Sequence, residues 1–218
     1  MDSPIIFYTP GLKDITMFLV LEGIDGSGKE TQVKLLAERL AKAGRRVELL
    51  DFPDYNSEPG KKIGQYLNHE IQMTNEELAA LYSEDRKLQQ AKIRQWLDEG
   101  RIVIADRYAY SNLAYQLANR VDYHYLRSLD KELIFPETVF FIDTSVDEVI
   151  KRMGSSRKKD KYESNRVYLK LVSGIYKRLA EGDIEGFGKA KWIRIDGNKS
   201  IDEVHKEIWK YVEACLSG

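Results

Sequence analysis

The sequence predicts an α/β protein with a five-stranded parallel sheet flanked by helices. Two observations predict this fold: five short apolar runs, and long intervening segments in which apolar residues recur at helical spacing. Alternation of these two segment types is typical of strand–helix–strand units. Because the runs are continuously apolar, we expect strands that are buried on both faces. The five runs are Phe18–Leu21, Val47–Leu50, Ile102–Ala105, Val139–Ile142 and Trp192–Ile195.

Three apolar stripes predict the principal helices between and after these strands. The first ends at Gly44, a typical helix stop, and the second belongs to a longer helical stretch ending near Gly100. The third closes the chain. The stripes consist of Val33, Leu36, Ala37 and Leu40; of Leu78, Leu81, Leu88, Ile93 and Leu97; and of Ile201, Val204, Ile208, Tyr211 and Val212.

Composition restricts the class of protein. The 218 residues include 34 Lys and Arg against 35 Asp and Glu, so bulk positive charge for coating a nucleic acid polymer or a membrane is absent. The single cysteine, Cys215, cannot form an internal disulfide, which fits a cytoplasmic setting. No apolar run approaches the roughly 20 residues of a membrane helix. We expect one domain over residues 17–218, preceded by an extension over 1–16, with Met17 as a possible natural start.

A glycine-rich loop follows the first predicted strand and leads into the first helix. Its spacing, with Gly23, Gly26, Ser27, Gly28 and Lys29, is that of a phosphate-binding loop. Glycines allow successive backbone N–H groups to turn toward phosphate oxygens, and the helix N-terminus adds partial positive charge. Lys29 can reach the β- and γ-phosphates of a nucleotide. The alternative is a glycine-rich turn without a ligand.

The loop departs from the usual pattern at Glu30. Ser or Thr commonly occupies this position and contacts Mg²⁺, so Thr31 is the candidate for that role here. The Glu30 carboxylate can contact magnesium through water, or it can stabilise the first helical turn through the helix dipole. We favour the second interpretation.

The third predicted strand delivers an acid and a base at its carboxyl end. Asp106 can hold Mg²⁺ through water, and Arg107 offers a planar fork for phosphate. Ligands of open α/β sheets bind at this edge. A surface ion pair between the two neighbouring side chains is the alternative.

The segments Gly23–Gln32 and Asp106–Tyr108 together resemble thymidylate kinases, the nucleoside monophosphate kinases that make dTDP from dTMP and ATP. Further similarities extend through most of residues 17–212. The resemblance implies a P-loop NTPase-type three-layer fold with a mobile lid, Mg²⁺ as cofactor of ATP, and a homodimer. It also implies ATP contacts by Gly23, Gly26, Ser27, Gly28, Lys29, Glu30 and Thr31.

The same resemblance implies the dTMP-binding residues. Tyr82 and Arg86 match the residues that stack on and hydrogen-bond the thymine, and Tyr115 matches a tyrosine that crowds the 2′ position. Asp25 accepts a bond from the 3′-hydroxyl or steers Arg107. Packing alone is the alternative for Tyr82 and Tyr115, and turn capping is the alternative for Asp25. The expected set is Asp25, Phe52, Pro53, Tyr55, Tyr82, Arg86, Arg107, Ser111, Asn112 and Tyr115.

A basic segment is the candidate lid, at about residues 151–163. Residues 151–161 carry six basic residues against one acid, Asp160, and the run Asp160–Glu163 resembles the lid motif of the family. Because Gly26 stands where some thymidylate kinases have a base, we expect Arg157 to reach the phosphates, with Lys158 or Lys161 in reserve. Arg152 is expected to stack on adenine. A solvated basic loop is the alternative.

Expected catalytic residues are therefore Lys29, Arg107, Arg157 and Asp25, with Thr31 and Asp106 at the metal. Asp54 stands where the family often has an arginine after Phe-Pro, which leaves that contact to the acceptor phosphate unfilled. Two alternatives remain: a kinase for another deoxynucleotide or monophosphate, and a nucleotide-binding protein without turnover, as Glu30 and the missing arginine would suggest.

Overall fold

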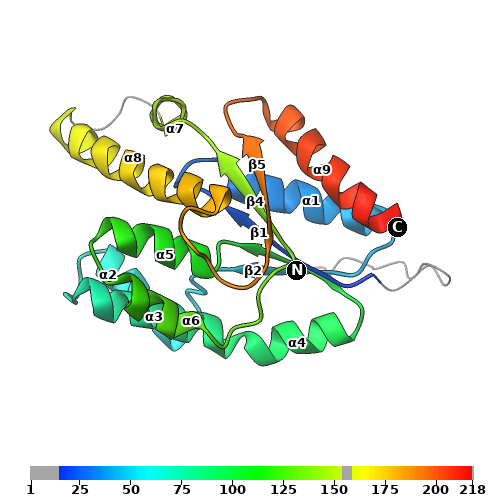
Figure 1. Cartoon of the computed structure of the whole chain (residues 1–218), viewed down its shortest axis with the longest axis horizontal. Helices are drawn as coiled ribbons and strands as arrows, with labels where there is room; N and C mark the ends of the chain where they lie inside the picture. Colours follow the sequence, from blue (N-terminus) through cyan, green and yellow to red (C-terminus); the bar gives the residue numbers. More distant parts are fainter. Residues whose placement is uncertain (1–14, 154–158, 218) are drawn as a thin grey trace.

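The computed structural model describes residues 15–153 and 159–217, and in the helical stretches next to the gap it describes no side chain from 153 to 165. Strands and helices alternate along the chain (Figure 1). The strands are β1 (Met17–Glu22), β2 (Val47–Asp51), β3 (Ile102–Asp106), β4 (Thr138–Asp143) and β5 (Lys191–Asp196). The helices are α1 (Lys29–Lys42), α2 (Glu58–Leu67), α3 (Asn75–Leu88), α4 (Gln90–Asp98), α5 (Ala109–Ala118), α6 (Tyr123–Asp130), α7 (Val146–Met153), α8 (Lys159–Glu181) and α9 (Ile201–Ser217).

The five strands form one parallel sheet in the order β2-β3-β1-β4-β5, which confirms the predicted fold class. Each predicted apolar run became a strand, extended by one or two residues. In the β1–β3 pair, Leu21 lies opposite Asp106. This register brings the start of the phosphate loop and the acid–base pair of β3 to the same edge of the sheet.

The strands differ in burial. Strands β1, β3 and β4 are buried along almost their whole length, as predicted. The prediction of burial on both faces is wrong for β2 and β5, because they are the two edge strands and each keeps exposed positions. Leu49 of β2, for example, is 48% exposed.

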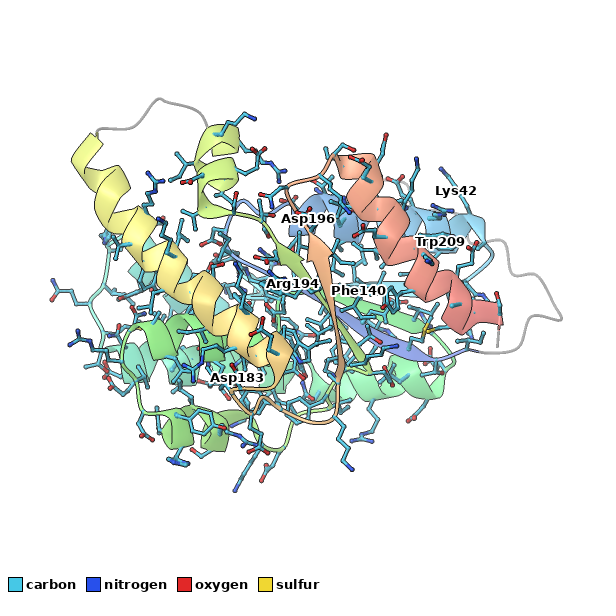
Figure 2. All side chains as sticks on the ribbon, turned by 45° about the horizontal axis from the view of Figure 1, so that its top comes forward. Lys42, Phe140, Asp183, Arg194, Asp196 and Trp209 are labelled. Carbon is cyan, nitrogen blue, oxygen red and sulfur yellow. The ribbon has the colours of Figure 1, made fainter. Side chains whose placement is uncertain are left out.

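Two apolar clusters lie on opposite faces of the sheet. Phe18 and Val20 of β1 pack into the cluster under α5 and α8, whereas Leu19 and Leu21 pack into the cluster under α1 and α9. Trp209 of α9 joins the second cluster, and the guanidinium carbon of Arg39 on α1 lies 4.1 Å from its ring centroid (Figure 2). The alternation along β1 makes this strand the centre of a three-layer molecule.

The predicted helical stretch over residues 78–97 consists of two helices, α3 and α4, that meet at Gln89 and end just before Gly100. The backbone N–H of Gln89 bonds the carbonyl of Arg86, a tightened turn that ends α3. Leu88, assigned to the apolar stripe, is 58% exposed. In the last stripe Ile201 is likewise exposed, whereas Val204, Ile208 and Val212 are buried as predicted.

The first helix agrees with its predicted stripe, since Val33, Leu36 and Leu40 are buried and Gly44 follows the helix with φ of 74°. Most of the predicted N-terminal extension, residues 1–14, lies outside the described residues, as do Arg157 and Lys158 of the predicted lid. In the part of the chain that is described, none of the helices has both the length and the apolar character required to cross a bilayer.

Candidate active site

The phosphate loop joins the end of β1 to the start of α1. Gly23, Gly26 and Gly28 have φ angles of 150°, 77° and 96°, which other residues rarely adopt. A Cβ on Gly23 would lie 2.7 Å from the carbonyl oxygen of Ile142. Gly28 stands at the N-cap of α1 without a side-chain cap, so the first N–H groups of the helix have no capping side chain. The sequence therefore builds an anion site from backbone.

Lys29, the first residue of α1, is buried, and its ammonium group contacts the backbone at the start of the loop. Its Nζ donates to the carbonyl oxygens of Gly23 and Ile24, each at 2.9 Å. Burial and the positive charge of Arg107 together lower the pKa of Lys29 to about 8, against the opposing effect of Asp106 and Asp25.

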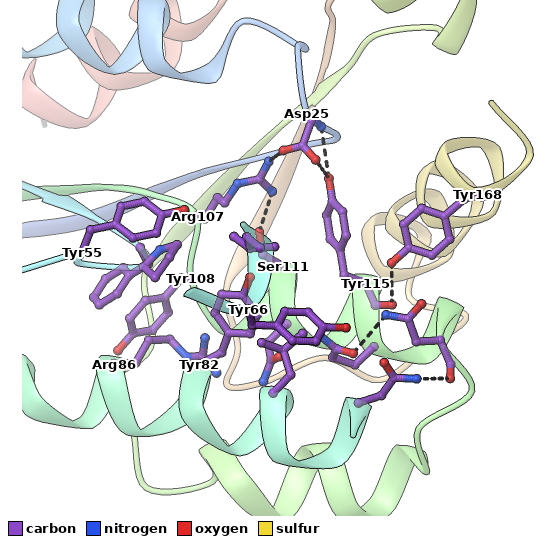
Figure 3. A pocket seen from close by; sticks show the side chains of 18 residues that line it. Asp25, Tyr55, Tyr66, Tyr82, Arg86, Arg107, Tyr108, Ser111, Tyr115 and Tyr168 are labelled. Atoms are coloured by element: carbon purple, nitrogen blue, oxygen red, sulfur yellow. Dashed lines mark hydrogen bonds and ion pairs between the residues drawn. The ribbon is translucent and has the colours of Figure 1, made fainter. Parts of the chain in front are cut away.

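Arg107 connects the third strand with the loop. One Nη donates to the carbonyl of Gly23 and to Ser111 Oγ, both at 3.2 Å, and the other pairs with Asp25 Oδ1. The hydroxyl of Tyr115 donates to Asp25 Oδ2 at 3.0 Å (Figure 3). Of the two roles expected for Asp25, steering Arg107 is therefore visible in the structure.

The charges of Lys29 and Arg107 influence the pKa values of the two neighbouring carboxylates, Asp106 and Asp25. Burial raises the pKa of Asp106, although Lys29 and Arg107 oppose it. Burial would also raise the pKa of Asp25, but the charges of Arg107 and Lys29, with the hydrogen bond from Tyr115, outweigh it and lower this pKa. The alternative of an isolated Asp106–Arg107 surface pair does not hold, because Arg107 pairs with Asp25 across the loop.

A cavity of about 470 Å³ lies between α2, α3, α5 and the loop (Figure 3). All ten residues expected to bind the acceptor nucleotide line this cavity. They are Asp25, Phe52, Pro53, Tyr55, Tyr82, Arg86, Arg107, Ser111, Asn112 and Tyr115. The structure thus brings together residues that are spread over about 90 positions of the sequence.

The far wall of this cavity carries polar side chains in an otherwise apolar setting. The amide nitrogen of Asn112 donates to the carbonyl of Ala79 at 3.1 Å, which fixes the amide, and its Oδ1 has no partner among the described residues. Arg86 pairs with Asp130 at 2.7 Å, while its Nε has no such partner. Buried polar atoms are nearly always satisfied, so these two point to a ligand with its own donors and acceptors.

A second cavity, of about 430 Å³, lies on the other side of the loop, next to α7 and α9. Five of the residues expected at the ATP site line it: Gly26, Ser27, Gly28, Thr31 and Arg152. Arg152 is held there by bonds to Glu148 and to the carbonyl of Gly197, at 3.1 and 2.8 Å. Gly23 and Lys29 belong to the same loop but do not line this cavity.

Glu30 points away from this cavity. It is exposed and pairs with Lys34 one helical turn later. The geometry therefore agrees with the dipole interpretation of Glu30.

Asp54, which stands where the family often has an arginine, has hydrogen-bond partners within the fold. Its backbone N–H bonds Asp85, and its carboxylate accepts from Gln89.

Several residues at the two cavities were missed by the sequence reasoning. Gln116 lines the first cavity one turn after Asn112, and this i, i+4 spacing was the available signal. The turn Gly197–Ser200, between β5 and α9, lines the second cavity. Only its place at the carboxyl edge of the sheet could have suggested it.

Arg157 and Lys158, expected to reach the phosphates, lie outside the described residues, and the side chain of Lys161 is not described.

Comparison with known proteins agrees with this geometry. The family model described as thymidylate kinase matches residues 21–208. The thymidylate kinase of Schizosaccharomyces pombe is 31% identical over 87% of this chain and 88% of its own length. A probable thymidylate kinase of Methanocaldococcus jannaschii is 35% identical over 90% and 96%, respectively. The solved structure of thymidylate kinase from Candida albicans superposes with a TM-score of 0.75 at 26% identity, covering 92% of both chains.

Proposed function

The chain belongs to the thymidylate kinase family, and on that premise we propose that it transfers the γ-phosphoryl group of ATP to dTMP, giving dTDP and ADP. One observation carries the proposal: the two cavities share a single phosphate loop. Asp25 lines one cavity, and its neighbours from Gly26 to Gly28 line the other. Two nucleotides bound there have their phosphates on adjacent residues, as in-line transfer requires.

The donor nucleotide occupies the cavity beside α7 and α9. The loop N–H groups and Lys29 hold the β- and γ-phosphates, and the adenine lies between Arg152 and the turn at Gly197–Ser200. The hydrogen bonds that the Arg152 guanidinium donates to Glu148 and to the Gly197 carbonyl hold it in place for stacking on a base. The proposed roles of Arg157, Lys158 and Lys161 at the transferred phosphoryl group rest on the sequence.

The acceptor base occupies the far end of the first cavity. Thymine presents a ring N–H next to two carbonyls, so it can donate to Asn112 and accept from Arg86, each of which has a buried atom without a partner among the described residues. Tyr82 and Phe52 supply the apolar and aromatic wall. Stacking of a base on an aromatic ring contributes about 1–3 kcal/mol.

The acceptor sugar and phosphate lie toward the loop. Tyr115 and Asp25 hold the deoxyribose, and Arg107 holds the acceptor phosphate opposite Lys29. Tyr55 and Ser111 complete the polar lining. The acceptor phosphate is already an anion, so the residues bind and orient it and need not remove a proton from it.

Asp106 and Thr31 fit a magnesium ion that accompanies ATP. Asp106 Oδ1 is buried without a partner among the described residues, and carboxylate and hydroxyl oxygens are ligands that Mg²⁺ prefers. When bound, the ion neutralises charge on the phosphates of the donor. The described residues contain no cluster of three or more His, Cys, Asp or Glu that would hold a metal by protein ligands alone. This donor set therefore suits an ion held largely by ATP and water.

For the assembly and location we propose a cytoplasmic homodimer, with the family resemblance as support. We also propose residues 17–218 as one kinase domain behind the extension at 1–16.

The proposal is tested by measuring ADP release with dTMP, dUMP, dGMP, AMP and UMP as acceptors. We expect the highest kcat/KM with dTMP. The comparison is needed because the Candida albicans enzyme is described as having broad substrate specificity. Turnover without preference for dTMP would leave a general nucleotide kinase. Tight binding of ATP and dTMP without ADP release would instead favour a nucleotide-binding protein that lacks catalysis.

A further inference from the structure

Glu22, the last residue of β1, is a fully buried carboxylate. Its Oε1 accepts from the backbone N–H groups of Tyr108 and Ser111 at 2.9 and 3.2 Å. Its Oε2 accepts from Ser111 Oγ at 2.5 Å and from the hydroxyl of Tyr176 at 2.8 Å. Four donors from α5, its N-cap and α8 therefore converge on one side chain of the central strand.

Two of these bonds cap helix α5 from outside. Its N-cap residue, Tyr108, makes no side-chain cap for the first N–H groups of the helix, although the N–H of Ser111 also bonds the Tyr108 carbonyl at 3.2 Å. Glu22 satisfies two of them and places negative charge at the positive end of the helix dipole. Burial raises the pKa of Glu22, while the bonds from Ser111 and the charge of Arg107 oppose the rise.

Arg107 directly precedes this cap and has an unusual backbone. Its φ is 67°, in the left-handed region that costs a non-glycine residue free energy. The turn is held on both sides, because the N–H of Arg107 bonds the Leu21 carbonyl at 3.0 Å and the next N–H bonds Glu22. The Arg107 guanidinium also rests on Ser111 Oγ, which Glu22 fixes.

We propose that Glu22, oriented by the hydroxyl of Tyr176, is a positioning residue that aims Arg107 at the acceptor phosphate. The proposal rests on the proposed kinase function and deepens it. Removal of the Tyr176 hydroxyl takes away one of the two donors to Glu22 Oε2 and the contact with Ser111 Oγ. The Ser111 hydroxyl that supports the Arg107 guanidinium is then held by fewer bonds, while the bonds of Arg107 to Asp25 and the Gly23 carbonyl remain. The competing view is that Glu22 is only a buried helix cap, which would affect stability and leave turnover unchanged.

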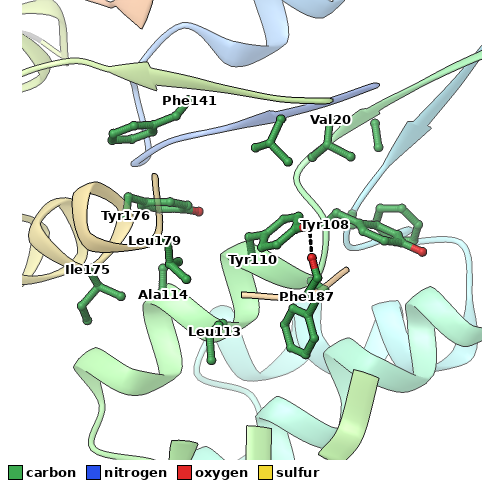
Figure 4. Packing of buried hydrophobic residues seen from close by; sticks show 14 of the residues in the cluster. Val20, Tyr108, Tyr110, Leu113, Ala114, Phe141, Ile175, Tyr176, Leu179 and Phe187 are labelled. Atoms are coloured by element: carbon green, nitrogen blue, oxygen red, sulfur yellow. Dashed lines mark hydrogen bonds between the residues drawn. The ribbon is translucent and has the colours of Figure 1, made fainter. Parts of the chain in front are cut away.

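Tyr176→Phe is the test variant, because the change removes one hydroxyl and keeps the ring. This ring is stacked on Phe141, with centroids 5.5 Å apart and planes 17° apart, and that packing is retained. Tyr110→Phe is the matched control: Tyr110 is equally buried, and its hydroxyl donates to the Phe187 carbonyl at 2.7 Å, outside the Glu22 set (Figure 4). Tyr176→Phe removes the contacts of the hydroxyl with Glu22 Oε2 and Ser111 Oγ, both at 2.8 Å, whereas Tyr110→Phe removes one buried hydrogen bond.

We expect Tyr176→Phe to lower kcat/KM for dTMP about three- to ten-fold, with little change in KM for ATP. This is less than the full loss of a hydrogen bond to a charged group, because the other three donors to Glu22 remain. Tyr110→Phe is expected to retain wild-type kinetics. The decisive measurement repeats Tyr176→Phe in an Arg107→Ala background, with dTMP affinity by calorimetry alongside turnover. If Tyr176 acts through Arg107, its effect disappears there.

Wild-type kinetics in Tyr176→Phe, an equal loss in Tyr110→Phe, or an undiminished effect in the Arg107→Ala background would each overturn the proposal. Glu22→Gln provides a second variant and is expected to show a larger loss with the same dependence on Arg107. The acceptor measurements on the wild-type protein come first. Failure there contradicts the kinase function, whereas a normal wild-type protein with a silent Tyr176→Phe contradicts only the positioning role.

Discussion

At the scale of single residues, Lys29 predicts how ATP binding depends on pH. Its pKa of about 8 in the free protein means that the ammonium loses its proton as pH rises through that value. Because the triphosphate binds the charged form, ATP affinity is expected to be constant below about pH 7 and to weaken above pH 8. Calorimetric titrations with ATP from pH 6.5 to 9.5 measure this dependence.

The matched control is Lys29→Arg, whose guanidinium stays charged throughout that range and should give a flat profile. A flat wild-type profile would contradict the assignment.

The pKa of Lys29 also determines how the free energy of unfolding of the ligand-free protein depends on pH. The folded-state pKa lies below the ordinary value of 10.5, so the contribution of Lys29 to the free energy of unfolding rises with pH between about 8 and 10.5.

The buried pair of Arg86 and Asp130 predicts a stability effect. Their side chains are 2% and 1% exposed and joined by a bond of 2.7 Å. Asp130→Ala leaves the guanidinium buried without its counter-charge, and we expect it to lower the free energy of unfolding by about 3–5 kcal/mol. Urea denaturation measures the loss. The double variant Arg86→Met with Asp130→Leu should lose less than Asp130→Ala, and an equal or larger loss would show that packing dominates.

At the scale of elements, helix α3 begins with a capping box that supports the acceptor cavity. Thr74 accepts from the N–H of Glu77 at 3.1 Å, and Glu77 accepts from the N–H of Thr74 at 2.7 Å. Thr74→Ala is expected to lower the free energy of unfolding by about 1 kcal/mol. Thr74→Ser keeps the hydroxyl and should stay near wild type in the same thermal melts. A loss shared by both variants would exclude the cap as the cause.

The elements also show what a pattern of residues can predict. Apolar runs predicted all five strands, because burial in a parallel sheet requires such runs. They did not predict that β2 and β5 are edges, since strand order depends on how the crossover helices pack. The apolar spacing continued across Gln89, although the backbone there breaks into α3 and α4. Periodicity reports which face is buried and says little about where a helix is interrupted.

At the scale of the whole molecule, ligands are expected to stabilise the fold through both cavities. A ligand at one hundred times its Kd adds about 2.7 kcal/mol to the free energy of unfolding. dTMP and ATP should each raise Tm of the wild type. Lys29→Ala should lose most of its turnover and most of the ATP-induced rise while it keeps the rise with dTMP. Thermal shift assays measure both, and a retained ATP response would contradict the loop assignment.

The candidate site could be predicted in part for a physical reason. The phosphate loop and Asp106–Tyr108 are local segments, so their spacing can be recognised in the sequence. The similarity to a family indicated ten of the residues that line the acceptor cavity. Asp130 and the turn Gly197–Ser200 carry no local pattern. They become functional candidates only through tertiary contact, with Arg86 and with Arg152. The residues next to them in the sequence do not indicate these tertiary contacts.

The position of β1 at the centre of the sheet has a consequence for how the protein can diversify. The helices whose residues line the acceptor base wall, α3 and α5, pack on one face, and α7, which carries Arg152 of the donor cavity, packs into the same apolar cluster through Val146 and Val149. The other helix at the donor cavity, α9, packs with α1 on the opposite face. Substitutions under α9 can therefore alter the choice of donor without disturbing the layer behind the acceptor, whereas substitutions under α7 fall in a layer that both cavities share.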